Sequence, residues 1–300
     1  STVPSVAKPA REAWRRAILR LDPVEESLPA LKEYVEDNPE DATARERLDS
    51  VTKSVGERRR QLSDPAYLAK RDGLAALEAG QLDAAQARLE EAMARRPDDA
   101  ETAGALGIVR LRQARHAEAH ELFVKAARLD AAGGAKWEGL ARTARYWDLL
   151  KQAGAARQSG QLELAEARLK EARGLDPNEP NAAIDLARLY AAQDRAADAE
   201  RLYREALAVE PGNASALEGL VTLLLRAGRD AEAGAILDKL EPARRREIAG
   251  AVDAVRAARL KDEAKRLQAQ GRGAQALAAL EQAAALDRDD PWLRLDLARA

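Results

Sequence analysis

Small and large apolar residues recur along most of the chain at intervals of 34 residues. Self-similarity at a fixed period of this length indicates a unit of two helices joined by a turn, with each unit stacked on the next. Small residues would let the two helices of a unit cross closely, and the larger ones would fill the space beside the crossing. The positions that share this register are Gly73 and Gly107; Ala165, Ala199 and Ala233; and Leu169, Tyr203 and Leu237.

Local signals predict where the two helices of each unit, here called the A helix and the B helix, begin and end. Glycine is favoured just past a helix end, where the A helix turns into the B helix. Proline ends the B helix because it cannot continue the hydrogen-bond ladder. The turn glycines are Gly80, Gly160, Gly228 and Gly271; the prolines after B helices are Pro97, Pro177 and Pro211; the expected caps of A helices are Asp99, Asn213 and Asp290; and Pro65 and Pro291 fit a first helical turn.

This pattern resembles the tetratricopeptide repeat family and predicts an all-α, right-handed solenoid of helix-turn-helix hairpins. Residues 291–300 would begin a further A helix, which we expect to fray without its B helix. Repeats are expected at residues 66–99, 100–133, 146–179, 180–213, 214–247 and 257–290.

Two helical insertions interrupt the period. Ala119 and Ala165 are 46 residues apart, which is 34 plus 12, and Ala233 and Ala276 are 43 apart, which is 34 plus 9. Helical spacing continues through the first insertion, so we expect a lengthened A helix there. The second insertion opens after Pro242 and is also helix-like.

The superhelix is expected to be interrupted at both insertions. Gly133 and Gly134 precede the first one and have the backbone freedom of a hinge, with a rigid linker as the alternative. Residues 1–62 show helical periodicity that we interpret as degenerate repeats. The expected segments are 1–62, N-terminal helices; 63–133, first repeat block; 134–145, inserted helix or hinge; 146–247, second repeat block; and 248–300, third block.

Composition supports a thin, repetitive structure, because only 3% of the 300 residues are aromatic while 46% are hydrophobic. The formal net charge of −2 predicts no nucleic-acid partner. The chain has no cysteine, which excludes disulfides and thiol nucleophiles. No apolar run approaches the roughly 20 residues that span a bilayer, so no membrane contact is expected. The chain starts at Ser1 and stops in mid-pattern, and we expect it to be a piece of a longer protein.

Catalytic chemistry finds no support in the sequence. His116 and His120 share one helix face, as a zinc site would need, but no third ligand is identifiable, so we predict no metal site. Phosphate-binding, dinucleotide and nucleophile-elbow motifs are absent. We therefore expect neither a catalytic residue nor a cofactor, and a protein that is not an enzyme.

Binding is the more promising function. Aromatic rings could serve as platforms for sugars, and the candidates are Tyr67, Trp137, Tyr146 and Trp147, with packing as the alternative role for each. Some repeat proteins of this kind hold a chaperone's terminal carboxylate in a clamp of lysine and asparagine. Lys70 alone matches that clamp, and Leu74 stands where its first asparagine should be, so we reject this function.

A more specific resemblance is to the periplasmic repeat region of the cellulose synthase operon protein C family, the outer-membrane cellulose export subunits. The order of the matching segments, with both insertions in place, is more specific than the period alone. The segments are LSDPAYLAKRDGLAALEAGQ at 62–81, ETAGALGIVRLRQ at 101–113, KW at 136–137, RYW at 145–147, RRREI at 244–248 and DDPWLRLDLARA at 289–300.

The resemblance implies a non-catalytic periplasmic scaffold within an outer-membrane protein. It implies other cellulose synthase complex subunits as partners, and it leaves open whether the repeats contact the β-1,4-glucan. Docking the export pore to the synthase machinery would be the role of such a segment. The alternatives are a peptide-binding adaptor that holds a partner segment in the concave groove, and a regulatory array fused to a glycosyltransferase.

Overall fold

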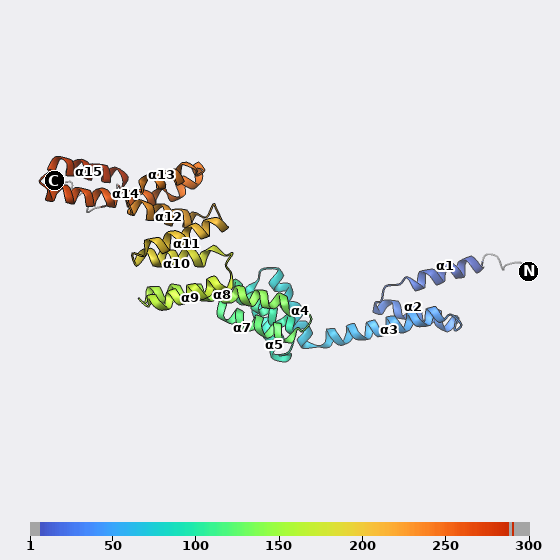
Figure 1. Ribbon diagram of the computed structural model, residues 1–300. Helices are drawn as coiled ribbons and strands as arrows, with labels where there is room; N and C mark the ends of the chain where they lie inside the picture. The colour runs from blue at the N-terminus through green and yellow to red at the C-terminus, as the bar shows by residue number, and fades with distance from the viewer. Residues whose placement is uncertain (1–6, 288–289, 291–300) are drawn as a thin grey trace, which may run out of the picture. The chain divides into compact units, whose positions relative to one another are not determined.

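The computed structural model describes residues 7–287 and residue 290, and within them every regular element is helical (Figure 1). This confirms the predicted all-α fold of stacked helical hairpins. The helix expected over 291–300 lies outside the described residues. The elements are α1 (Ala7–Leu19), η1 (Glu25–Ser27), α2 (Leu28–Asp37), α3 (Ala42–Ser63), α4 (Pro65–Glu78), α5 (Leu82–Arg95), α6 (Ala100–Arg112), α7 (His116–Leu129), α8 (Gly134–Gln158), α9 (Leu162–Leu175), α10 (Pro180–Ala192), α11 (Ala196–Val209), α12 (Ala214–Arg226), α13 (Asp230–Asp238), α14 (Pro242–Ala269) and α15 (Gly273–Leu286).

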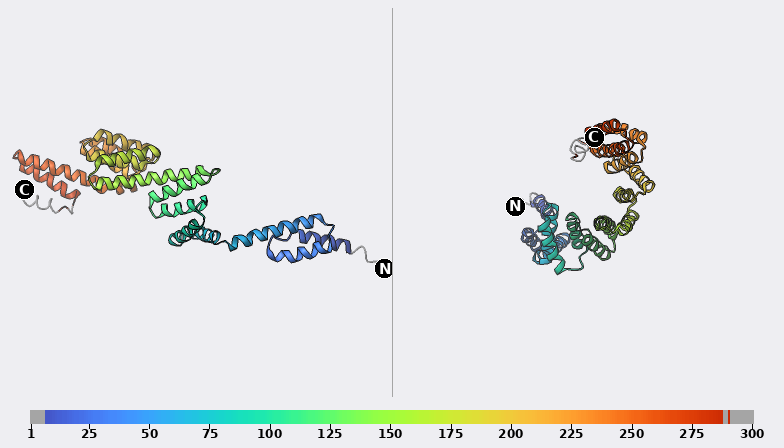
Figure 2. Two further views of the ribbon diagram at one scale, coloured as in Figure 1. Left: turned by 90° about the horizontal axis from the view of Figure 1, so that it is seen from below. Right: turned by 90° about the vertical axis from the view of Figure 1, so that its left-hand side faces the viewer.

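The helices form two compact units, residues 1–141 and 142–300. In the first unit, α4 pairs with α5 and α6 with α7, as the period predicts. In the second unit, α10 pairs with α11 and α14 with α15, and α10 also packs against α9 and α12. Figure 1 and Figure 2 show these second-unit hairpins, coloured yellow to red, following one another. Each hairpin therefore buries its apolar faces against its sequence neighbours, as expected for a repeat protein.

Small residues bring the two helices of a hairpin close together. A Cβ atom on Gly73 would lie 2.7 Å from Cγ of Leu89, and one on Gly107 would lie 2.7 Å from Cε1 of Phe123. The predicted close crossing is therefore present in both hairpins of the first unit. The corresponding residue in α10 is Ala187, which is fully buried.

The turns between A and B helices need a left-handed residue. Gly80 and its counterparts Gly160, Gly228 and Gly271 have φ between 74° and 77°, which confirms the predicted turns. Ala114 and Asp194 take the same place in their repeats with φ of 56° and 60°. The left-handed conformation costs a non-glycine residue about 1 kcal/mol, so hairpin packing imposes the turn where the local preference opposes it.

Both insertions lengthen A helices. Helix α8 has 25 residues, as expected, and α14 runs for 28 residues without a break. The expected segment limits at 145/146 and 247/248 fall inside these two helices. Helix α13 has only 9 residues and is shorter than the repeat 214–247 predicts. Pro242 at the start of α14 explains this, because proline cannot continue the preceding helix, and α12 then packs on both α13 and α14.

The N-terminal helices have a small core of their own. Ile18, Leu31, Tyr34 and Val51 are buried where α1, α2 and α3 meet. The side chain of Asp41 caps α3 by accepting a hydrogen bond of 3.2 Å from the backbone N–H of Ala44. These contacts place three packed helices ahead of the first regular hairpin.

Candidate functional site

A groove of about 220 Å³ lies over the A helices α10 and α12 of the second unit. Helix α11 contributes one side chain to it, and the small residues Ala191 and Ala192 of α10 leave it open. Most of its polar groups come from α12. The polar residues that line the groove are Arg188, Tyr203, Ser215, Glu218, Thr222 and Arg226. We call this set of residues the A-helix groove.

Tyr203 reaches the groove through the position of a glycine. The tyrosine is only 3% exposed, and a Cβ atom on Gly219 would lie 2.7 Å from its hydroxyl oxygen. Any other residue at this position of α12 would collide with the ring. Burial raises the pKa of Tyr203 to about 12, so the hydroxyl keeps its proton at neutral pH. It has no hydrogen-bond partner among the described residues, although it lines the groove.

Of the charged side chains that line the groove, only Arg188 forms an ion pair with a described residue. Nη1 of Arg188 donates to Oδ1 of Asp185 at 3.1 Å. Glu218 and Arg226 also line the groove, and neither forms an ion pair with a residue that the structure describes. A guanidinium offers five N–H donors, so Arg226 and the unused nitrogens of Arg188 can bind an incoming acceptor.

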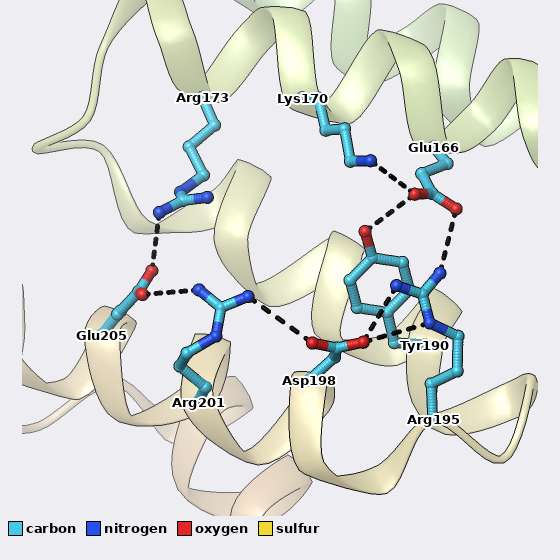
Figure 3. Close-up of polar contacts among 8 residues, drawn as sticks. All are labelled: Glu166, Lys170, Arg173, Tyr190, Arg195, Asp198, Arg201 and Glu205. Atoms are coloured by element: carbon cyan, nitrogen blue, oxygen red, sulfur yellow. Dashed lines mark hydrogen bonds and ion pairs between the residues drawn. The ribbon is translucent and has the colours of Figure 1, made fainter.

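On the B-helix side of the second unit, polar contacts tie successive repeats together (Figure 3). Glu166 of α9 accepts a hydrogen bond of 2.9 Å from the hydroxyl of Tyr190 in α10. It also pairs with Lys170 at 2.6 Å and with Arg195 at 3.3 Å. The guanidinium of Arg195 lies 3.6 Å from the centre of the Tyr190 ring. The bond from Lys170 is the largest cause that lowers the pKa of Glu166, so this carboxylate is ionised at neutral pH.

The same contact recurs one period later. Glu200 and Arg229 stand 34 residues after Glu166 and Arg195, and they pair at 2.6 Å. We call these two pairs the inter-repeat ion pairs. Because each joins a B helix to the turn of the next hairpin, they couple neighbouring repeats along the stack.

A second link joins α9 to α11 (Figure 3). Nη2 of Arg173 donates to Glu205 at 2.9 Å, and Arg201 donates to the same carboxylate at 3.0 Å. Arg201 also lies 3.7 Å from Asp198. The charged side chains on this side of α9 and α11 therefore already bind one another.

Trp137, one of the predicted sugar platforms, packs inside the first unit. It is 6% exposed, stacks on Phe123 with ring centres 6.4 Å apart, and donates from Nε1 to Asp130 at 3.2 Å. A Cβ atom on Gly104 would lie 2.7 Å from Cζ2 of the indole. Neither face of this ring is free for a ligand, so the packing role applies to it.

Tyr146 is also covered, at 2% exposed. Its hydroxyl accepts a hydrogen bond of 2.9 Å from the backbone N–H of Ala182 and donates to the carbonyl of Glu179 at 3.4 Å. The side chain of Glu179 makes no capping bond at the start of α10. Tyr146 therefore satisfies a backbone donor in the first turn of the next repeat.

Trp147 and Tyr67 keep exposed surface. Trp147 is 36% exposed and meets the Tyr146 ring edge to face, with centres 5.4 Å apart. Tyr67 is partly exposed. Each is the second residue of its repeat, and the same position in the repeat between them is Glu101, which pairs with Lys70 at 2.7 Å. These two rings remain candidate ligand contacts.

The loop before α8 is held by one carboxylate. Asp130 accepts a hydrogen bond of 2.7 Å from the N–H of Gly133, and its other oxygen accepts from Trp137. Gly134 is the first residue of α8, and a Cβ atom on it would lie 3.1 Å from the carbonyl oxygen of Ala127. A hinge at Gly133 and Gly134 stays a prediction.

One of the two histidines contacts the backbone of the first unit. Nδ1 of His120 lies 2.9 Å from the carbonyl oxygen of Ala141. Within residues 7–287 and 290, no three His, Cys, Asp or Glu side chains are grouped to hold a metal ion. No helix in this part of the chain has the length and apolar character needed to cross a membrane.

Comparison with known proteins identifies the repeats. The tetratricopeptide repeat family matches residues 71–135, 156–204 and 191–258. Cellulose synthase operon protein C of Xanthomonas axonopodis pv. citri is 39% identical over 300 residues, which covers 98% of this chain and 19% of the relative. The protein of the same name from Pseudomonas fluorescens is 32% identical over 292 residues, covering 97% and 22%.

The chain belongs to the tetratricopeptide-repeat region of the cellulose synthase operon protein C family. It spans about a fifth of the length of these relatives, at 19% and 22%. Among solved structures, the crystal structure of MamA protein matches 59% of this chain and 90% of its own at 19% identity, with a TM-score of 0.38.

Within this cellulose synthase operon protein C segment, sequence reasoning missed the A-helix groove. Tyr203 was read only as a large packing residue, like Leu169 and Leu237 at the same repeat position. The available signal was a hydroxyl at a position that is otherwise apolar. Its neighbour Gly219 lies outside the predicted register of small residues, so nothing in the period marked it.

Proposed function

We propose that this chain is a non-catalytic scaffold segment of a bacterial cellulose synthesis and export machinery. It lies in the periplasm as part of an outer-membrane protein, docks other subunits of the complex, and spaces the outer-membrane pore from the synthase. The observation that carries this proposal is the similarity to cellulose synthase operon protein C over 98% of the chain.

The arrangement of the side chains supports a scaffold over an enzyme. Hydrogen bonds from Lys170 and Arg229 lower the pKa values of Glu166 and Glu200, respectively. Both carboxylates are therefore ionised at neutral pH and committed to ion pairs, which makes them poor general acids. The inter-repeat ion pairs instead favour a stack that keeps its neighbouring hairpins in register.

Guiding the glucan is the finer part of the proposal. Trp147 and Tyr67 have exposed ring surface at equivalent repeat positions, and aromatic rings with a free face suit the apolar faces of sugar rings. Hinge bending at Gly133 and Gly134 would let the reach of the scaffold vary.

Site-specific crosslinking in cellulose-producing cells tests the docking role. A photo-crosslinking amino acid replaces Ser215 in the A-helix groove of the full-length protein, and the matched control replaces Ala167, which is exposed on the B helix α9. We expect Ser215 to capture a subunit of the cellulose synthase complex and Ala167 to capture none. Capture of no complex subunit from any A-helix position would contradict the docking role.

A peptide-binding adaptor outside cellulose synthesis is the second candidate function. One observation favours it: the A-helix groove contains the unpartnered hydroxyl of Tyr203 beside the unpaired Arg226. Crosslinking would then capture a protein that is unrelated to the synthase complex, and cellulose export would survive loss of the groove.

A further inference from the structure

We propose that Met93 is a modification site: a peroxide oxidises its thioether to the sulfoxide, and the sulfoxide oxygen then accepts a hydrogen bond from the ammonium of Lys125. The modification links two neighbouring hairpins of the first unit, because Met93 belongs to the B helix α5 and Lys125 to the B helix α7. This inference does not depend on the proposed function.

The sulfur of Met93 lies beside a positive charge. Its Sδ is 3.6 Å from Nζ of Lys125, and both side chains are partly exposed. A thioether is only a weak acceptor, whereas an ammonium has three N–H donors. Lys125 forms no ion pair with a residue that the structure describes. A stronger acceptor at the position of the sulfur therefore has a donor within reach.

The same two repeat positions hold an ion pair in the second unit. Arg173 of α9 and Glu205 of α11 correspond to Met93 and Lys125 in the repeat register, and the residues of each pair are 32 apart in the sequence. Nη2 of Arg173 donates to Glu205 at 2.9 Å (Figure 3). These positions therefore form a polar link between successive B helices. In the first unit the link lacks a strong acceptor, which oxidation of Met93 supplies.

The oxidation needs no reactant other than the peroxide. The sulfur attacks one oxygen of hydrogen peroxide, so that the S–O bond forms as the O–O bond breaks. The departing hydroxide takes the proton of the transferred hydroxyl and leaves as water, while the sulfur loses two electrons and the peroxide is reduced. Partial exposure of Met93 gives the oxidant access. The flexible side chain lets the new oxygen turn towards the ammonium.

The neighbouring Lys125 determines whether oxidation stabilises or destabilises the first unit. A sulfoxide is polar and disrupts the packing of an apolar core. Met93 lies outside the buried cluster that contains Leu89 and Val109, so little packing is lost when it becomes polar. A hydrogen bond from a charged donor is about twice as strong as one between neutral groups. Oxidation therefore strengthens the contact between α5 and α7.

Hydrogen exchange with and without peroxide treatment tests the site on the 300-residue chain. Met93 is the only methionine and the chain has no cysteine, so mass spectrometry of proteolytic fragments assigns an added oxygen to it directly. We expect one oxygen on Met93 and about fivefold slower exchange of the amides in α5 and α7, as one more hydrogen bond to a charged group predicts. Methionine sulfoxide reductases should restore the original rate.

Lys125→Ala is the decisive variant, because its oxidised form keeps the polar sulfoxide and loses the donor. The amides of α5 and α7 should then exchange faster after oxidation, whereas Lys125→Arg should still show the slower exchange. Met93→Leu should not respond to peroxide, which controls for oxidation of tryptophan. Lys53→Ala, at an exposed lysine of α3, is the matched control and should respond as the wild type does.

Three results would overturn the proposal. One is the absence of an added oxygen on Met93 in the folded chain, which would show that peroxide does not reach the sulfur. The others are unchanged or faster exchange in the oxidised wild type, and the same slower exchange in oxidised Lys125→Ala. Either of these would show that Lys125 does not bind the sulfoxide.

Discussion

The hydroxyl of Tyr190 donates a hydrogen bond of 2.9 Å to Oε1 of Glu166 and so joins two successive repeats. Tyr190 lies near the end of α10 and is buried, whereas Glu166 belongs to the preceding B helix α9. One period later, Leu224 stands in the place of Tyr190, so the pair of Glu200 and Arg229 has no tyrosine hydroxyl beside it. Two equivalent interfaces of the stack are therefore held by different sets of polar contacts.

Tyr190→Phe should destabilise the second unit by about 1 kcal/mol, because it removes one hydrogen bond to a charged group across a repeat interface. Tyr203→Phe is the matched control, since its hydroxyl has no partner among the described residues, and its effect should stay within about 0.5 kcal/mol. Urea denaturation at neutral pH, followed by circular dichroism, measures both. Equal shifts in the two midpoints would show that the bond to Glu166 contributes nothing.

Trp137→Ala should cost the first unit about 3–5 kcal/mol, the range for removing a buried large aromatic side chain. Its indole fills the space beside Gly104 and stacks on Phe123. Trp147→Ala removes a ring that is 36% exposed, so we expect a smaller loss of about 1–2 kcal/mol. Thermal and urea unfolding of the two variants compare them directly, and a larger loss for Trp147→Ala would contradict the packing described for Trp137.

Cello-oligosaccharide binding should depend on Trp147. We expect cellotetraose at about millimolar concentration to shift the indole signal of Trp147 in NMR spectra, and Trp147→Ala to remove the saturable response. Trp14→Ala is the matched control, because Trp14 is exposed on α1 and lies outside the regular repeats expected from residue 66 onwards. An unchanged titration in Trp147→Ala, or no response of the wild type, would count against a glucan contact at this ring.

Gly80→Ala should destabilise the first hairpin by about 1 kcal/mol, because alanine disfavours the φ of 74° at this turn. Gly56→Ala in the middle of α3 should instead stabilise by up to about 1 kcal/mol. An added Cβ atom there meets nothing within 4 Å. Denaturation midpoints of the two variants should therefore move in opposite directions, and movement in the same direction would contradict the turn geometry.

Acid should weaken the N-terminal helices through Asp41. The hydrogen bond from Arg15 is the largest cause that lowers the pKa of Asp41 from 3.8 to about 2. A carboxyl with a lowered folded-state pKa stabilises the fold above its ordinary pKa, and this contribution is lost as the pH falls from about 4 towards 2. Solvent partly screens the pair because the Arg15 side chain is 43% exposed, so we expect about 1 kcal/mol.

Asp41→Asn should lose that contribution at neutral pH and show less acid sensitivity. Chemical denaturation of wild type and variant at about pH 7 and pH 2.5 tests this, and the stability difference between them should shrink at the lower pH. A difference that stays constant with pH would show that Asp41 acts only as the cap of α3.

Helix boundaries were the most predictable feature, because the signals that set them are local. Pro65 opens α4, the side chain of Asp99 accepts from the N–H of Thr102 at 2.9 Å, and Gly80 turns left-handed, all as the sequence predicts. The sequence did not predict the turn at Ala114, which adopts the same left-handed conformation without glycine. Stacking of the flanking hairpin decides that turn, and stacking is not a local property.

The four candidate aromatic rings differ in exposure, and this difference also depends on non-local packing. Trp137, Tyr146, Trp147 and Tyr67 look alike as candidate rings in the sequence, yet the first two are covered and the last two keep exposed surface. What covers them comes from the neighbouring helices: Gly104 leaves the room for Trp137, and the start of α10 receives the hydroxyl of Tyr146.

By itself, the sequence determined the all-α class, the 34-residue unit, the glycine turns and the lengthened A helix at the first insertion. Each of these depends on residue preferences within one hairpin. Only the tertiary structure decided the ion pairs between repeats and the A-helix groove. There the hydroxyl of Tyr203 reaches the surface at Gly219 of the next repeat. Such contacts depend on how one helix crosses another, and ring exposure or an unpaired donor is a property of that crossing rather than of either residue alone.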